Sequence, residues 1–448
     1  MGERLCSVGI DVGTTTTQLV VSVLTVENRA SGFAVPHMDI TDREVVYESP
    51  VHFTPLLGKD LVDARALASL VQKEYRNAGI TPADVDTGAV IITGETSRKE
   101  NAAAVVEHLS RLAGDFVVAT AGPDLESALA AKGAGATVFS EKSGKRVLHM
   151  DIGGGTSNLA LIENGQVVKT GCLNVGGRLI KLEQGAIIYM SPVLKDLTSL
   201  QVGDIPTRQQ LFDIAQLLAR ALETAAGLRP ADEAYHSLLT REAAPWRPES
   251  AQVISFSGGV ADCIEKEVPW DAYGDIGPLL GQAIRESHLC KQEYRLGKHT
   301  IRATVMGAGC YSTQLSGSTV YRKGIDLPVK GLPAVVFSKQ TRVTAEEIAR
   351  CFSTLDGCGV LAMPGISSPS YGQVRQLAQT ILQGIPQGPL YICIEEDHAK
   401  ALGQALALLA PGRNCICLDN LKLQEDSFLD IGLPVGPALP VVIKTLVL

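Results

Sequence analysis

The chain has 448 residues, 45% of them hydrophobic and 20% charged, with a formal net charge of -8. This length and composition are typical of a soluble globular protein of two or three domains, and the acidic balance argues against nucleic acid as a partner. No apolar stretch is long enough to span a membrane, and residues 1–4 lead directly into a predicted strand instead of a signal peptide. We therefore expect a cytoplasmic protein without a membrane partner.

The first third of the chain is predicted to alternate strands and helices. A strand over residues 5–12 and a β-branched strand over 18–26 should form a hairpin, with Asp11 and a glycine-threonine turn at its tip. Further strands are expected at 45–47, 89–92 and 116–119, and helices at 63–78, 98–112 and 124–132. This order of elements predicts a first α/β lobe.

The middle third repeats this plan. Strands are expected at 147–151 and 159–162 on either side of a second glycine turn, and Asn164-Gly165 predicts a further hairpin. We also expect a strand at 252–257, helices at 207–227 and 277–286, and a helix that opens at 174–178. These elements predict a second α/β lobe.

From about residue 320 the pattern changes to short apolar strands separated by helices. Strands are expected at 335–337, 359–362, 390–395, 415–418 and 440–447, with helices near 344–355, 369–384 and 398–410. This alternation predicts a small parallel sheet. The whole prediction is an α/β protein with one lobe over 1–145, a second over 146–320 and a smaller C-terminal α/β domain over 321–448.

Two acid-glycine turns, one in each lobe, repeat one another. An offset of 140 positions superimposes them without a gap, and the matching pairs are Asp11 and Asp151, Gly13 and Gly153, Thr16 and Thr156, and Gln18 and Asn158. Glycine turns allow backbone N–H groups to approach phosphate oxygens, because no Cβ intervenes. A carboxylate beside such a turn can hold Mg²⁺ through water or orient an attacking water.

The two turns together predict a site in which one polyphosphate is bound by both lobes, from opposite sides. Asp11 and Asp151 are the candidate catalytic and metal-binding residues. A third segment follows the strand at 252–257, and a nucleotide base could stack on its backbone. The candidate cofactor-binding residues are therefore Gly13, Thr14, Thr15, Gly153, Gly154, Gly155, Thr156, Ser257, Gly258 and Gly259.

Five motifs in this order resemble the actin, Hsp70 and sugar-kinase ATPase superfamily over residues 5–320. They are the two phosphate loops at 11–15 and 151–156, the adenosine motif at 257–260, and the two connecting helices at 124–133 and 307–317. The resemblance implies two RNase H-like lobes that close on ATP and Mg²⁺. It also implies a binding role for Gly176 and Gly177, which match the glycine pair after the second loop of Hsp70-like members.

Within this superfamily, the whole chain resembles the ethanolamine ammonia-lyase reactivating factors, including residues 94–101 and the C-terminal region. This resemblance implies an ATP-dependent chaperone with weak ATPase activity, rather than a metabolic enzyme. Its partner would be ethanolamine ammonia-lyase, from which it releases damaged cobalamin so that intact adenosylcobalamin can bind. It further implies a location associated with a bacterial microcompartment.

Several points stay open at this stage. The acid of the first connecting helix is either Asp124 or Glu126, and Glu95 either positions water or faces solvent. A small-molecule kinase and an actin-like filament protein are the alternative functions within the same superfamily. The sequence does not show a base-off cobalamin motif, because Asp397 and His398 are adjacent and Ala401 stands where a glycine is needed. The oligomeric state, the lyase-contacting surface and whether the chain acts alone are also left open.

Overall fold

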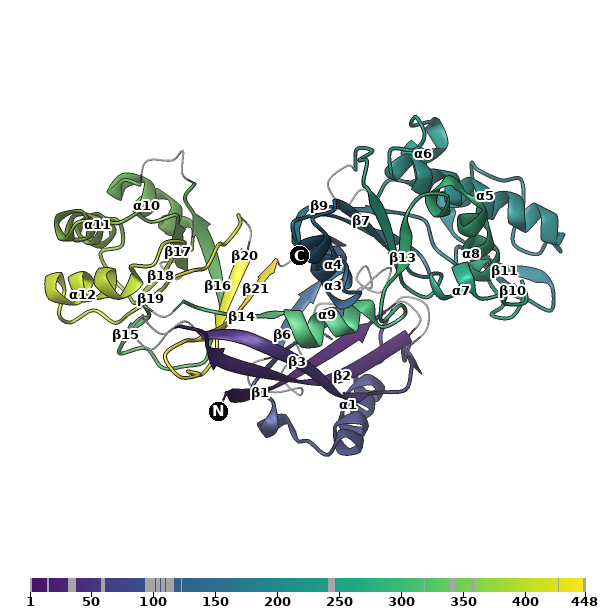
Figure 1. The fold of residues 1–448 in the computed structure, drawn as a ribbon. Helices are drawn as coiled ribbons and strands as arrows, with labels where there is room; N and C mark the ends of the chain where they lie inside the picture. The colour runs from purple at the N-terminus through teal and green to yellow at the C-terminus, as the bar shows by residue number, and fades with distance from the viewer. Residues whose placement is uncertain are drawn as a thin grey trace.

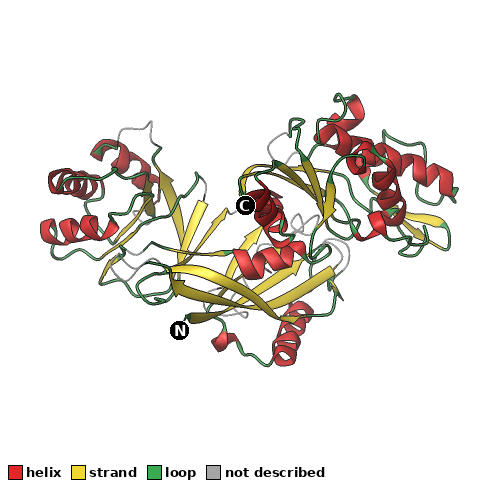
Figure 2. Cartoon of the chain, in the orientation of Figure 1, coloured by secondary structure: helices red, strands yellow, loops and turns green. Residues whose placement is uncertain are grey.

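The computed structural model describes residues 2–13, 16–30, 38–57, 61–92, 101, 105, 109, 117–121, 123–240, 246–317, 319–338, 343–355, 359–425 and 427–445. Figure 1 shows three parts, with the first lobe between the second lobe and the C-terminal domain. Figure 2 shows that each part combines a sheet with helices. Within the described residues, no helix is both long and apolar enough to cross a membrane.

The first lobe is built on a sheet in the order β3-β2-β1-β5-β6, with β4 paired to β2. The first three strands are antiparallel, whereas β5 and β6 continue parallel to β1. Helix α1 starts at the N-cap Asp63 and packs its apolar side on this sheet. The bounds are β1 Glu3–Val12, β2 Thr16–Asn28, β3 Met38–Glu48, β4 His52–Phe53, α1 Ala64–Ala78, β5 Thr87–Ile92 and β6 Val117–Ala121.

The second lobe carries a sheet of the same plan, in the order β13-β12-β7-β8-β9. Strands β7, β8 and β9 are antiparallel, and β12 and β13 continue parallel to β7. The bounds are β7 Val147–Ile152, β8 Ser157–Glu163, β9 Gln166–Leu173, β10 Ile180–Glu183, β11 Ala186–Met190, α5 Arg208–Ala225, α6 Glu233–Leu238, β12 Val253–Ser257, α7 Asp262–Glu265, α8 Gly277–Glu286 and β13 Tyr294–Leu296.

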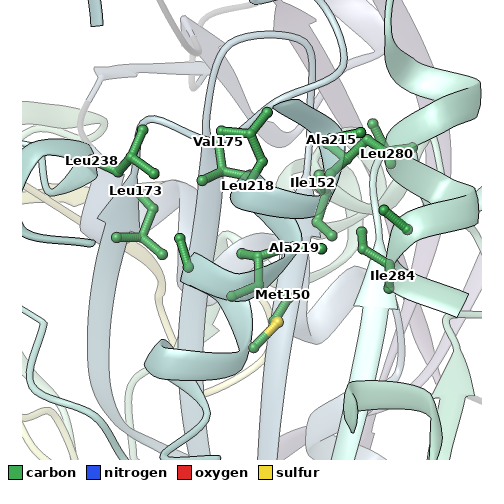
Figure 3. Close-up of a cluster of buried hydrophobic side chains, with 14 of the residues drawn as sticks. Met150, Ile152, Leu173, Val175, Ala215, Leu218, Ala219, Leu238, Leu280 and Ile284 are labelled. Atoms are coloured by element: carbon green, nitrogen blue, oxygen red, sulfur yellow. The ribbon is translucent and has the colours of Figure 1, made fainter. Parts of the chain in front are cut away.

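Both lobes therefore have the strand order 3-2-1-4-5 with the same parallel and antiparallel pairings, which confirms the predicted pair of RNase H-like lobes. In the second lobe, one face of the sheet is covered by α5 and α8. Met150 and Ile152 from β7 pack there against Leu218 and Ile284, as Figure 3 shows. Alternation along β7 turns His149 and Asp151 to the opposite face.

Two helices join the lobes, α3 (Pro123–Gly133) and α9 (Ala303–Tyr311), while α4 (Ala136–Ser143) follows α3. Helix α3 contacts the sheet of the second lobe, α9 contacts that of the first, and the two helices pack on each other. Their approach requires glycine, because a Cβ on Gly307 would meet the backbone of Leu129. The second connecting helix was predicted at 307–317, but α9 covers Ala303–Tyr311, and strand β14 (Thr313–Leu315) follows it.

The C-terminal domain is an eight-stranded mixed sheet in the order β14-β21-β20-β16-β17-β18-β19-β15. The predicted parallel part is confirmed in β16 to β19, with α10, α11 and α12 as the crossover helices. The bounds are β14 Thr313–Leu315, β15 Tyr321–Lys323, β16 Val329–Val336, α10 Ala345–Phe352, β17 Val360–Met363, α11 Tyr371–Gly384, β18 Leu390–Ile394, α12 Ala399–Leu409, β19 Cys415–Leu418, β20 Ser427–Ile431 and β21 Pro440–Thr445.

Three further local predictions differ from the structure or fall outside it. The segment 174–178 does not open a helix but forms a loop that leads to β10. The strand expected at 45–47 is part of the much longer β3, which pairs along β2. The helix predicted at 98–112 lies mostly outside the described residues.

Candidate functional site

The two acid-glycine turns are closed by the same backbone hydrogen bond. In the first, Gly13 N donates to Thr16 O at 2.9 Å, and in the second, Gly153 N donates to Thr156 O at 2.9 Å. The strands beside them also pair alike, because Asp11 faces Gln18 just as Asp151 faces Asn158. The repeat found in the sequence therefore corresponds to a repeated hairpin, one at the end of the central strand of each lobe.

The second turn offers unpaired donors to a ligand. Residues 153–156 are half-exposed, and the N–H groups of Gly154, Gly155 and Thr156 make no hydrogen bond to any described residue. Consecutive free N–H groups in a turn form a concave site for an anion. In the first turn, Gly13 is described, whereas Thr14 and Thr15 lie outside the described residues.

The glycine pair after the second hairpin, Gly176 and Gly177, packs closely against the backbone of the second turn. Gly177 N donates to Gly153 O at 3.0 Å, and Arg178 N donates to Gly154 O at 2.6 Å. A Cβ on Gly176 would collide with the backbone of Gly154. The N–H of Gly177 is thus engaged in a hydrogen bond inside the protein. The segment that follows the hairpin therefore binds carbonyl oxygens of the turn, and the N–H groups of the turn remain available to a ligand.

The third predicted segment, at 257–259, contacts the second turn directly. Ser257 lies opposite Asp151 in the parallel pairing of β12 with β7, and Val260 N donates to Ile152 O at 3.2 Å. Gly258 adopts φ +85, and a Cβ there would meet the backbone of Ile152. Only glycine combines this left-handed conformation with such a close approach.

A chain of buried polar groups ends on the carboxylate of Asp151. Ser257 Oγ donates to Asp151 Oδ1, and Thr304 Oγ1 donates to Oδ2 at 3.5 Å. On the other side of Ser257, His149 Nε2 lies 2.9 Å from Ser257 Oγ, and His149 Nδ1 lies 3.1 Å from Ser255 Oγ. Because Ser257 gives its proton to Asp151, a neutral imidazole must donate from Nε2 and accept at Nδ1.

Burial shifts both titratable groups of this chain toward their neutral forms. Asp151 is 7% exposed, and desolvation raises its pKa to about 6, although the hydrogen bonds from Ser257 and Thr304 oppose the shift. His149 is fully buried, and desolvation followed by the positive charge of Arg295 lowers its pKa to about 3. His149 is therefore neutral at pH 7, and the carboxylate of Asp151 is ionised but poorly solvated.

A segment that the sequence analysis did not single out, residues 300–304, lies between the two turns. Gln18 Nε2 from the first hairpin donates to Ile301 O at 3.2 Å, while Thr304 reaches Asp151 of the second hairpin. Arg302 is held by the first lobe, through Ser49 O at 2.8 Å and the carboxylate of Glu48 at 3.3 Å. The N-terminus of α9 thus contacts both halves of the candidate site.

The sequence left the roles of three acidic residues undecided, and these residues differ in their exposure and in whether the structure describes them. Asp124 is exposed and accepts a hydrogen bond from Thr170 Oγ1 of β9 at 2.7 Å. Glu126 is buried within the first turn of α3. Glu95 lies outside the described residues.

Comparison with known proteins identifies the family. A family model described as ethanolamine utilisation protein EutA matches residues 3–448. The chain belongs to the EutA family. Two EutA proteins named ethanolamine ammonia-lyase reactivase, from Salmonella typhimurium and Escherichia coli K12, are 36% and 35% identical to it. Each alignment covers 99% of this chain and 98% of the relative, so the similarity includes the C-terminal domain. The resemblance to the reactivating factors is thereby confirmed.

Solved structures similar to this EutA family member match about two-thirds of the chain. A Ppx/GppA family protein from Aquifex aeolicus, 13% identical, covers 68% of this chain and 97% of its own, with a TM-score of 0.42. The ethanolamine utilisation protein EutJ from Carboxydothermus hydrogenoformans, 17% identical, covers 68% of this chain and 89% of its own, with a TM-score of 0.34.

Proposed function

We propose that this chain is an ATP-dependent reactivating factor of ethanolamine ammonia-lyase. It would release damaged cobalamin from the inactivated lyase so that intact adenosylcobalamin can bind. The observation that carries the proposal is the near full-length similarity to two proteins named as reactivases of that lyase. Action beside the lyase, in association with a bacterial microcompartment, is part of the same proposal.

The donors of the second turn and the acids of both turns suit a magnesium-bound nucleotide. Gly154, Gly155 and Thr156 present N–H groups that no described residue binds and that suit phosphate oxygens. Asp11 and Asp151 supply carboxylate oxygens, which are the ligands that Mg²⁺ prefers. When bound, the metal would neutralise phosphate charge next to these acids. Ser257 and Thr304 hold the carboxylate of Asp151 in place through its two oxygens.

The segment at 300–304 supports a mechanism in which the bound nucleotide determines how the two lobes are oriented relative to each other. It contacts Gln18 and Glu48 of the first lobe and Asp151 of the second. A γ-phosphate between the turns would favour one arrangement of these contacts over another, and hydrolysis would remove that preference. The resulting movement of the lobes is the proposed driving force for release of damaged cobalamin from the lyase.

The test is a reactivation assay. Hydroxocobalamin-inactivated ethanolamine ammonia-lyase is incubated with the protein, Mg-ATP and fresh adenosylcobalamin, and ammonia release is followed. We expect activity to return only when both ATP and Mg²⁺ are present. Absence of recovery with the wild-type protein would contradict the proposed function. Equal recovery with an Asp11→Asn/Asp151→Asn double variant would contradict the proposed nucleotide site.

A further inference from the structure

A polar cavity lies away from the turns, where the first lobe, the end of α3 and the C-terminal domain meet. Its volume is about 280 Å³. Arg43 of β3, Lys132 of α3, Tyr311 of α9 and Asn420, which follows β19, are among its lining residues. It thus brings together side chains from three parts of the molecule that are distant in the sequence.

Arg43 is fixed at the wall of this cavity. Its Nε donates to Cys310 O at 2.9 Å, and its Nη1 donates to Ile40 O at 3.3 Å. The guanidinium carbon also lies 5.0 Å from the centre of the Tyr311 ring. These contacts use only part of the guanidinium, because Nη2 makes no hydrogen bond to any described residue.

Lys132, in the last turn of α3, faces the same cavity without a partner. Its ammonium makes no hydrogen bond or ion pair with any described residue. Burial, and then the positive charge of Arg43, lower the pKa of Lys132. The carboxylate that also lines the cavity, Asp39, is paired with Arg29 at 3.6 Å. Two cations therefore face one small space, and no carboxylate in the described chain neutralises Lys132.

The helix dipole alone does not account for this arrangement. A lysine in the last turn stabilises a helix through its charge, but it can do so from solvent. Lys142 occupies the last turn of the adjacent helix α4 and is exposed. Lys132 is half-buried, and partial burial of its ammonium beside a second cation costs free energy unless an anion compensates both charges.

We propose that this cavity binds a small oxyanion, of the phosphate or carboxylate class, between Arg43 and Lys132. The cavity, at about 280 Å³, is smaller than the roughly 300–1,000 Å³ typical of pockets for larger organic ligands. The side-chain amide of Asn420, which has no hydrogen bond to described residues, supplies a third donor from the C-terminal domain. A bound ion would then link β3, α3 and the C-terminal domain at a site separate from the nucleotide turns.

The test compares the full-length protein with two variants, Lys132→Met and the matched control Lys142→Met. Binding of inorganic phosphate, sulfate and succinate is measured by calorimetry and by thermal unfolding, against sodium chloride of equal ionic strength. Saturating Mg-ADP occupies the nucleotide turns. We expect wild type and Lys142→Met to bind one ion per chain, and Lys132→Met to bind it about tenfold or more weakly.

The ligand-free Lys132→Met variant serves as the folding control. Because the substitution removes a half-buried charge that lies beside a second cation, the Tm of this variant without added ions should equal or exceed that of wild type. Its stabilisation by the added ion should be lost. Tighter binding of phosphate and sulfate would identify a site for phosphate-like ions, and tighter binding of succinate would identify a site for carboxylates. Equal binding by Lys132→Met and wild type, or no binding of any of the three ions, would overturn the proposal.

Discussion

Ser257 donates a hydrogen bond to the carboxylate of Asp151, and this contact joins two motifs separated by about a hundred residues. Thr304 approaches the other oxygen of the same carboxylate from α9. The orientation of Asp151 is therefore set by both the third glycine segment and a connecting helix. A change in either of these two elements should therefore alter the candidate nucleotide site.

Replacement of either turn acid should abolish function while the fold is kept. We expect Asp11→Asn and Asp151→Asn each to lower ATP turnover about 100-fold or more, because each would remove a carboxylate that we propose holds the metal beside the phosphates. Circular dichroism checks the fold, and release of phosphate from ATP checks the activity. The control Asp213→Asn, on the exposed face of α5, should behave as wild type. Full activity in either turn variant would refute the assignment.

Asp151 should make stability depend on pH in a direction opposite to that of most carboxylates. Its pKa is about 6 in the folded protein and 3.8 without the fold, so the folded state retains a proton that the unfolded chain loses between these values. Stability therefore falls as pH rises through this range, and the loss is complete above pH 6. In urea unfolding without nucleotide, Asp151→Asn should gain about 3 kcal/mol at pH 7.5 and little at pH 4.

His149 should contribute the reverse slope. Its pKa falls from 6.5 to about 3 on folding, so the unfolded chain binds the extra proton between these values, and stability is lost as pH falls from 6.5. At pH 5 this loss is about 2 kcal/mol. His149→Gln, whose amide can still bond Ser255 and Ser257, should recover that amount at pH 5 relative to pH 7.5. An unchanged pH profile would show that His149 is not buried in its neutral form.

Gly176 should be intolerant of a side chain. In Gly176→Ala the new Cβ would press on the backbone of Gly154, so we expect a loss of about 1–3 kcal/mol in stability and weaker nucleotide binding. Gly412 provides a matched control, since a Cβ there would meet no atom within 4 Å. Thermal unfolding and nucleotide titration of both variants measure the two effects. Equal behaviour of the two variants would contradict the bracing role of Gly176.

Residue patterns predicted the hairpins because their signals are local. Alternating apolar residues mark the strands, and acid-glycine sequences mark the turns at 11–15 and 151–156. The site residues around 300–304 have no such signal, since Thr304 and Ile301 acquire their role from contacts with distant segments. Asn174 to Arg178 suggested a helix start, but the glycine pair is needed for a close backbone approach. Pairing of β14 with β21, near opposite ends of the C-terminal domain, likewise leaves no local pattern.

Only Ser312 separates the end of α9 from the start of β14. Since β14 forms one edge of the eight-stranded sheet, the C-terminal domain is attached to the connecting helix as a lever arm. With strands about 4.8 Å apart, its opposite edge lies about 30 Å away. A tilt of α9 by about 10° would carry that edge through about 5 Å. A small rearrangement at the N-terminus of this helix would thus be amplified into a displacement large enough to strain a docked protein.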